Sequence, residues 1–126
     1  MLKKFVVVTA LLNFLFAPML IVQAIQTQDP GNFVFSFTLS GLFIMAASLL
    51  IWATSDLPNR APVLFWSAIS RLVAITTVVY AVPNGLAEPS QYAFVVFDGT
   101  VAVIYIIGAM RVTGRSFLDF LLWRIA

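Results

Sequence analysis

The segment of residues 62–82 reads PVLFWSAISRLVAITTVVYAV, and Arg71 is its only charged residue. The segment of residues 92–110 reads YAFVVFDGTVAVIYIIGAM and also carries a single charge, Asp98. Both segments are long enough to cross a bilayer as helices. An ionised side chain at the centre of a bilayer costs about 3 kcal/mol or more, so such residues usually face the interior of a bundle and pair. The two segments therefore predict neighbouring membrane helices that share an ion pair.

The composition extends this interpretation to the whole chain. Of its 126 residues, 62% are hydrophobic and 10% are charged, whereas soluble domains are about 25% charged. A soluble chain of this length could not bury so much apolar surface, which makes the bilayer its natural solvent. We expect an all-α membrane protein in which residues 1–126 form a single domain, an antiparallel bundle of four transmembrane helices.

Four apolar runs predict the spans, at about residues 5–25, 33–54, 62–82 and 91–110. Between the first two, Asp29-Pro30-Gly31-Asn32 suits a type II turn, which requires a positive φ at its third residue. Pro18 removes one backbone hydrogen bond from the first span and predicts a kink. The tail of residues 111–126 is too short to span, and after Gly114 it predicts a short interfacial helix.

The start of the chain has two interpretations. Lys3-Lys4 before an apolar run, with Val22-Gln23-Ala24 as a cleavage site, is typical of a signal peptide. The apolar run is longer than the apolar region of a usual signal peptide and long enough to cross a bilayer, so we expect the first span to be retained.

In the second span, Ser36 and Ser40 are small residues four positions apart, a spacing that allows transmembrane helices to approach closely.

Basic residues are distributed asymmetrically about the four spans. With an even number of spans both termini lie on one side, and that side carries six of the seven basic residues: Lys3, Lys4, Arg60, Arg111, Arg115 and Arg124. The loops of the opposite side contain no Lys or Arg. Because basic loops stay in the cytoplasm, we expect a multi-pass protein of the cytoplasmic (inner) membrane with both termini cytoplasmic.

A depth count indicates that the two intramembrane charges meet. At 1.5 Å per residue, Arg71 lies roughly 14 Å into a span that starts near Pro62, and Asp98 roughly 18 Å from the end of a span that stops near Met110. A flexible arginine side chain can bridge that difference, so we expect a buried ion pair. Further candidates for the same ion-pair or ligand site are Tyr105, Ser67, Ser70 and Asn13.

Cysteine and histidine are absent from the chain. Their absence excludes disulfides, thiolate chemistry and the usual imidazole ligands of haem and zinc. Two separated carboxylates on the outer loops give little support to a calcium site, and no basic stripe indicates nucleic-acid binding. We expect no catalytic residue, no metal and no cofactor, and an enzyme is the least favoured class of function.

Two functions remain open for Arg71 and Asp98. In the first, the pair fixes the third span against the fourth in a non-enzymatic structural or accessory subunit of a membrane complex or homo-oligomer. In the second, it lines a mid-membrane cavity of a small transporter or lipophilic-ligand-binding protein, since intramembrane ionisable residues often mark such paths. A permanently charged arginine beside Asp98 suits a fixed contact better than a proton relay. Membrane lipids are expected partners in both cases.

The pattern resembles the small DoxX-like bacterial proteins, which are four-helix integral membrane proteins. The resemblance rests on four spans with short loops, Asn59-Arg60 before the third span, Ser70-Arg71 within it and Phe97-Asp98-Gly99 within the fourth. It implies a four-helix bundle and, from some relatives, quinone-associated or thiol-redox chemistry. This chain has no cysteine, so the thiol-redox chemistry of those relatives is not expected here.

Overall fold

A computed structural model of the chain describes residues 1–124, which form helices and turns without a strand. The helices are α1 (Leu2–Thr27), α2 (Phe33–Ala53), α3 (Leu57–Ala81), the short 3-10 helix η1 (Pro89–Gln91), α4 (Tyr92–Thr113) and α5 (Phe117–Leu121). The four long helices are each long and apolar enough to cross a membrane. The predicted all-α fold is confirmed, and the chain is a multi-pass membrane protein.

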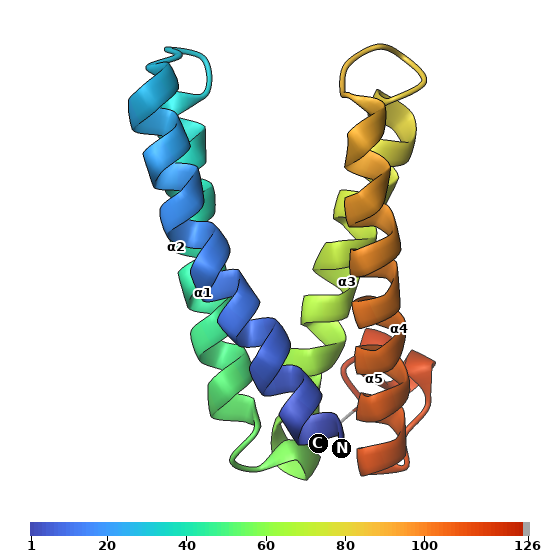
Figure 1. Cartoon of the computed structure of the whole chain (residues 1–126). Coiled ribbons are helices and arrows are strands. Elements are labelled where there is room, and N and C mark those ends of the chain that lie inside the picture. The colour runs from blue at the N-terminus through green and yellow to red at the C-terminus, as the bar shows by residue number, and fades with distance from the viewer. Residues whose placement is uncertain (125–126) are drawn as a thin grey trace. The chain divides into compact units, whose positions relative to one another are not determined.

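The helices form two compact units, Met1–Ser55 and Asp56–Ala126. In the first unit α1 packs along α2, and in the second α3 packs along α4 (Figure 1). Each unit is thus a helical hairpin closed by a short loop. That all four spans belong to one domain stays a prediction.

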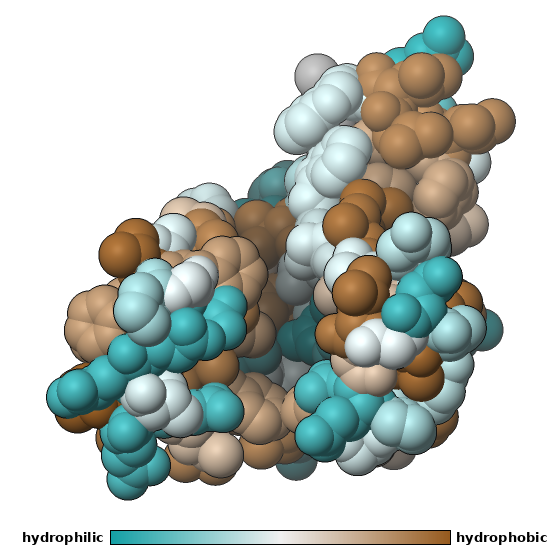
Figure 2. Space-filling model, turned by 90° about the horizontal axis from the view of Figure 1, so that it is seen from above, coloured by the Kyte–Doolittle hydropathy of each residue, from teal (hydrophilic) through white to brown (hydrophobic). Residues whose placement is uncertain are grey.

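Large hydrophobic side chains are exposed along each of the long helices. Examples with more than half of their surface exposed are Leu15, Val34, Val73 and Val96. On each hairpin, hydrophilic residues gather at the end that carries the loop, and hydrophobic residues cover the flanks (Figure 2). This is the distribution that a helix surface in contact with lipid tails requires.

The first hairpin is held by small residues and one hydrogen bond between its helices. Ala10, Ala17 and Ala24 on α1 are all buried, which lets α2 approach closely. Ser40 on α2 is 1% exposed, and its hydroxyl donates to the Ala17 carbonyl of α1 at 2.9 Å. α1 continues through Pro18 to its end.

The turn between α1 and α2 differs from the predicted type. The Asn32 N–H donates to the Asp29 carbonyl at 3.1 Å, as in a turn, but Gly31 lacks the positive φ that a type II turn needs. The Asp29 carboxylate instead accepts from the Gly31 N–H at 3.0 Å and from the Asn32 side-chain amide at 2.8 Å. An aspartate side chain that bonds to the backbone two residues on can organise a turn without a left-handed glycine.

The helices of the second hairpin are longer than predicted. α3 begins at Leu57 rather than near Pro62, because Pro58 sits in the first turn, where a missing N–H costs nothing. Pro62 lies inside the helix, which loses one backbone hydrogen bond there. α4 continues to Thr113 and ends at Gly114, whose φ of 66° closes the helix in the left-handed conformation.

α5 is short but well capped. The Ser116 hydroxyl accepts from the Asp119 N–H at 3.2 Å, and the Asp119 carboxylate accepts from the Ser116 N–H at 3.0 Å. These two bonds form a capping box, which satisfies backbone donors at a helix start. The predicted short helix after Gly114 is therefore present.

Aromatic rings attach α5 and the residues after it to the first half of α3. The Phe120 ring stacks on Phe65 with centroids 5.0 Å apart, and the Trp123 ring stacks on Trp66 at 5.3 Å. Phe65 and Phe120 are fully buried. Such pairs stabilise a contact by about 0.5–1.5 kcal/mol beyond the area they bury, so the tail is fixed against the hairpin.

Candidate functional site

The second hairpin brings the two intramembrane charges together. Arg71 Nη1 lies 2.5 Å from Asp98 Oδ1. At 1.5 Å per residue, Arg71 is roughly 21 Å along α3 from Leu57, and Asp98 is roughly 22 Å from the end of α4 at Thr113. Both observed helices extend further than predicted at the same end of the hairpin, α3 by five residues and α4 by three, and this removes most of the predicted difference in height. The charges therefore lie at nearly equal heights, Arg71 near the middle of α3 and Asp98 in the first third of α4.

The expectation that this pair is buried is wrong. The Arg71 side chain keeps 11% of its surface exposed and the Asp98 side chain keeps 21%. The physical reason is geometric, because two helices meet along a seam and a seam cannot enclose a side chain on all sides. The pair is half-buried, with an open edge on the surface of the second hairpin.

Tyr105 supports the pair with its ring. It is fully buried, and the centroid of its ring lies 5.9 Å from Arg71 Cζ. A guanidinium within about 6 Å of an aromatic face is attracted by the negative charge of that face. The structure presents the Tyr105 ring to Arg71, a contact that the sequence pattern did not predict.

The other candidates from the sequence, Ser67, Ser70 and Asn13, stay predictions as partners of the ion pair. The Ser70 hydroxyl donates to the Ser67 carbonyl within α3 at 2.8 Å, which is a local bond of the helix surface. Asn13 belongs to α1 in the first unit, where it is 4% exposed. Its role as a partner of the pair stays a prediction.

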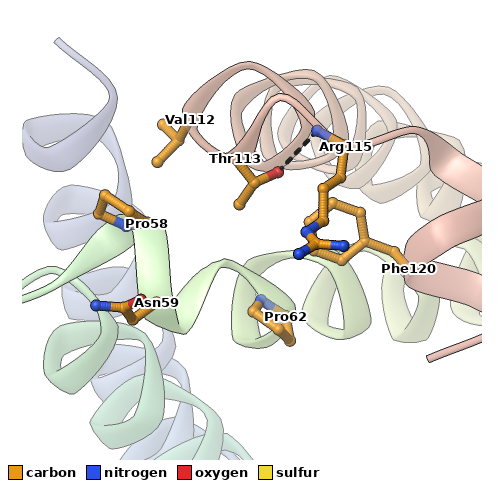
Figure 3. A pocket seen from close by; sticks show the side chains of 7 residues that line it. All are labelled: Pro58, Asn59, Pro62, Val112, Thr113, Arg115 and Phe120. Carbon is orange, nitrogen blue, oxygen red and sulfur yellow. Dashed lines mark hydrogen bonds between the residues drawn. The ribbon is translucent and has the colours of Figure 1, made fainter. Parts of the chain in front are cut away.

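A cavity of about 260 Å³ lies at the end of the second hairpin where α3 begins and α4 ends (Figure 3). Its lining comes from three helices and the α4–α5 connection, and comprises Pro58, Asn59, Pro62, Val112, Thr113, Arg115 and Phe120. Sequence reasoning missed this site because it needs α3 to start at Leu57 and α5 to fold back on α3. The signal in the sequence was Arg115 directly after the left-handed Gly114.

A second hollow, of about 360 Å³, lies along the surface of α1 and is lined by Leu15, Pro18, Met19, Val22, Gln23 and Gln26. Neither of these two cavities is lined by Arg71, Asp98 or Tyr105. Within residues 1–124, no group of three or more His, Cys, Asp or Glu residues could hold a metal ion.

Comparison of the chain with protein-family models, with curated proteins and with solved structures finds no match. What the protein does is therefore inferred from its own helices and side chains.

Proposed function

We propose that this chain is a non-enzymatic membrane subunit that assembles with a second copy of itself, with the Arg71–Asp98 pair fixing α3 against α4. One observation carries the proposal. Arg71 and Asp98 form an ion pair inside two membrane-spanning helices, with 11% and 21% of their side chains exposed. A larger membrane complex is the wider setting in which such a subunit can act.

An open charged edge at this depth needs a cover. Water can solvate an exposed ion pair in a soluble protein, but the hydrocarbon of a bilayer cannot, and charged side chains there face other protein groups or a water-filled space. A second protein surface that supplies hydrogen-bond partners lowers this cost. Covering the open edge therefore favours association of this hairpin with another protein surface.

The geometry of the pair favours a second copy as the cover. Because the two charges lie at nearly equal heights, the line from Asp98 to Arg71 runs parallel to the membrane plane. A two-fold axis along the membrane normal reverses that direction, so Arg71 of one copy would face Asp98 of the other. An ion pair held in this way is self-complementary, which is what a symmetric dimer interface requires.

The residues around Arg71 allow close approach. Ser70 and Ala74 on α3 are both exposed, and Ala74 lies three positions after Arg71, on the same face of the helix. Small residues at such positions let the backbone of a second helix come near. They support an interface that includes the open edge.

Cross-linking at single cysteines tests the proposal, and the absence of native cysteine keeps the background clean. Ala74→Cys places a thiol beside the open edge. Val96→Cys is the matched control, since Val96 is 71% exposed and points about 200° away from Asp98 around α4. In membranes, a short thiol-reactive cross-linker should join two copies through Ala74→Cys and leave Val96→Cys monomeric. A chain that stays monomeric with both variants would contradict the proposal.

The open edge also favours a second candidate, a small transporter or lipophilic-ligand binder that uses the space around the pair. The double variant Arg71→Leu/Asp98→Leu separates the two. A transporter would keep its fold in this variant and lose the flux of a lipophilic ion across proteoliposomes. A structural subunit has no such flux to lose.

We also propose the cytoplasmic membrane as the location, with both termini in the cytoplasm, and a relation to the small DoxX-like proteins. The six basic residues on one side of the four spans support the orientation. The sequence pattern around Asn59-Arg60, Ser70-Arg71 and Phe97-Asp98-Gly99 supports the relation.

A further inference from the structure

The cavity at the start of α3 joins polar side chains with one arginine. Arg115 follows Gly114 and reaches from the end of α4 toward Pro62 on α3 (Figure 3). Its backbone N–H donates to the Thr113 hydroxyl at 3.3 Å, and its Nη1 donates to the Arg124 carbonyl at 2.5 Å. A guanidinium has five N–H donors in a planar fork. The Arg115 backbone is therefore bonded to a side-chain hydroxyl and its guanidinium to a backbone carbonyl, in the wall of a cavity large enough for a small polar group.

The charges around the cavity are predominantly positive. Four arginines of the second unit belong to this end of the hairpin, Arg60, Arg111, Arg115 and Arg124, against two aspartates, Asp56 and Asp119. Both carboxylates serve local bonds: Asp56 accepts from the Asn59 side-chain amide at 2.8 Å, and Asp119 accepts from the N–H and the hydroxyl of Ser116. The excess of positive charge favours an anionic ligand.

The surface beside the cavity is apolar. α5 and the residues after it lie at the end of the second hairpin, next to the cavity. There the side chains of Leu118, Leu122 and Trp123 are 61%, 53% and 64% exposed. Exposed leucine and tryptophan next to basic residues are typical of a segment that lies in the membrane–water interface. A ligand with an anionic head and apolar tails matches both surfaces at once.

We infer that this cavity binds the phosphate headgroup of an anionic phospholipid, with Arg115 bonded to the phosphate oxygens and the acyl chains lying along α5. Arginine suits this ligand because its planar fork can donate two parallel hydrogen bonds to a phosphate. Basic pockets between transmembrane helices on the cytoplasmic side commonly hold such headgroups. The Asn59 and Thr113 side chains are further polar groups in the cavity wall. This inference does not depend on whether the chain forms a dimer.

Native mass spectrometry of the full chain in mild detergent tests the site. The protein is mixed with equal amounts of phosphatidylglycerol and phosphatidylcholine that carry the same acyl chains. The wild type should retain the anionic lipid about tenfold better, and Arg115→Gln should remove most of that preference. Arg111→Gln is the matched control: it removes the same charge from the last turn of α4, and Arg111 does not line the cavity. It should change the preference less than about twofold.

A second variant tests the cavity rather than the charge. Val112→Phe fills the space and keeps every arginine, so it should also remove the preference. Circular dichroism and the tryptophan fluorescence of each variant verify that it folds. If Arg111→Gln and Arg115→Gln weaken retention equally, the attraction is that of a general basic surface and the inference fails. It fails too if Val112→Phe retains the anionic lipid, or if millimolar inorganic phosphate displaces that lipid completely, since the site would then bind free phosphate.

Discussion

Arg71 and Asp98 illustrate how a cost at one residue is offset by another. Each charge alone would be expensive inside the bilayer, and the contact of 2.5 Å between them neutralises both. Tyr105 adds the negative face of its ring on the side of Arg71. The part of the pair that stays exposed lowers its contribution to the stability of the hairpin and favours association with another surface.

Removal of one charge should be worse than removal of both. We expect Arg71→Leu or Asp98→Leu to lower the free energy of unfolding by about 2 kcal/mol, less than for a fully buried pair because both side chains stay partly exposed. The double variant Arg71→Leu/Asp98→Leu should recover to within about 1 kcal/mol of the wild type. Unfolding in bicelles, followed by steric trapping, measures all three. A double variant as unstable as the sum of the single variants would show that the two residues act independently.

The sequence predicted which residues pair but not how they are covered. A charge in an apolar segment needs an opposite charge, so the partners of Arg71 and Asp98 could be read from spacing and depth. Their exposure depends on how many helices surround the seam between α3 and α4, and no local pattern carries that information. The contact of Tyr105 through its ring was missed for a related reason, because side-chain direction is set by packing.

A single hydrogen bond can hold one helix against another. The Ser40 hydroxyl joins α2 to the Ala17 carbonyl of α1 in a buried position. Ser40→Ala should lower the free energy of unfolding by about 0.6–1.7 kcal/mol, the range found for polar contacts between transmembrane helices. Ser36→Ala is the control, since Ser36 is four positions away and is not buried. Steric trapping measures the free energy of unfolding of both variants. Equal losses in Ser40→Ala and Ser36→Ala would argue against a specific role of the Ser40 bond.

The capping box of α5 predicts a response to acid. Bonds from the backbone N–H and the hydroxyl of Ser116 lower the pKa of Asp119 below its usual 3.8, and Arg115 and Arg124 act in the same direction. In the folded tail the carboxylate therefore stays ionised to a lower pH than in the unfolded tail. The stability that it gives α5 is complete above pH 3.8 and is lost as the pH falls through the lowered value.

Tryptophan fluorescence can follow this loss, because Trp123 stacks on Trp66 only while the tail is folded against α3. In a Trp52→Phe background the signal should stay constant from neutral pH down to 3.8 and change below it. Ser116→Ala removes the hydroxyl bond and brings the pKa of Asp119 in the folded tail closer to 3.8, so the change should be complete at a higher pH than in the parent protein. A change that ends at the same pH in both proteins would mean that the capping box does not control the tail.

Helix ends were the least predictable elements. Proline suits a first turn, and the sequence offers both Pro58 and Pro62 while the apolar run predicts a start near Pro62. In the structure the first turn of α3 holds Pro58, and Pro62 lies inside the helix one turn later. That difference is what creates the cavity wall around Pro58 and Asn59. The short α5 could be predicted from Gly114, whereas its stacking on α3 involves residues far apart in the sequence.

The proposed orientation of the whole molecule rests on the number of spans and the position of its basic residues. We expect Gly31→Cys and Glu88→Cys, in the loops without Lys or Arg, to react with a membrane-impermeant maleimide in intact cells. Ser55→Cys, between α2 and α3, should react only after the membrane is permeabilised. Each variant carries a single thiol because the chain has no cysteine. Labelling of Ser55→Cys in intact cells would reverse the proposed topology.

The equal depth of Arg71 and Asp98 has an electrical consequence. A transmembrane voltage acts along the bilayer normal. Moving one elementary charge through 100 mV changes its electrostatic free energy by about 2.3 kcal/mol. Because the two opposite charges lie at nearly the same height on α3 and α4, a vertical shift or a tilt of the hairpin moves both through nearly the same potential. The two contributions cancel. The hairpin can therefore hold two charges inside an energised membrane and remain insensitive to its voltage.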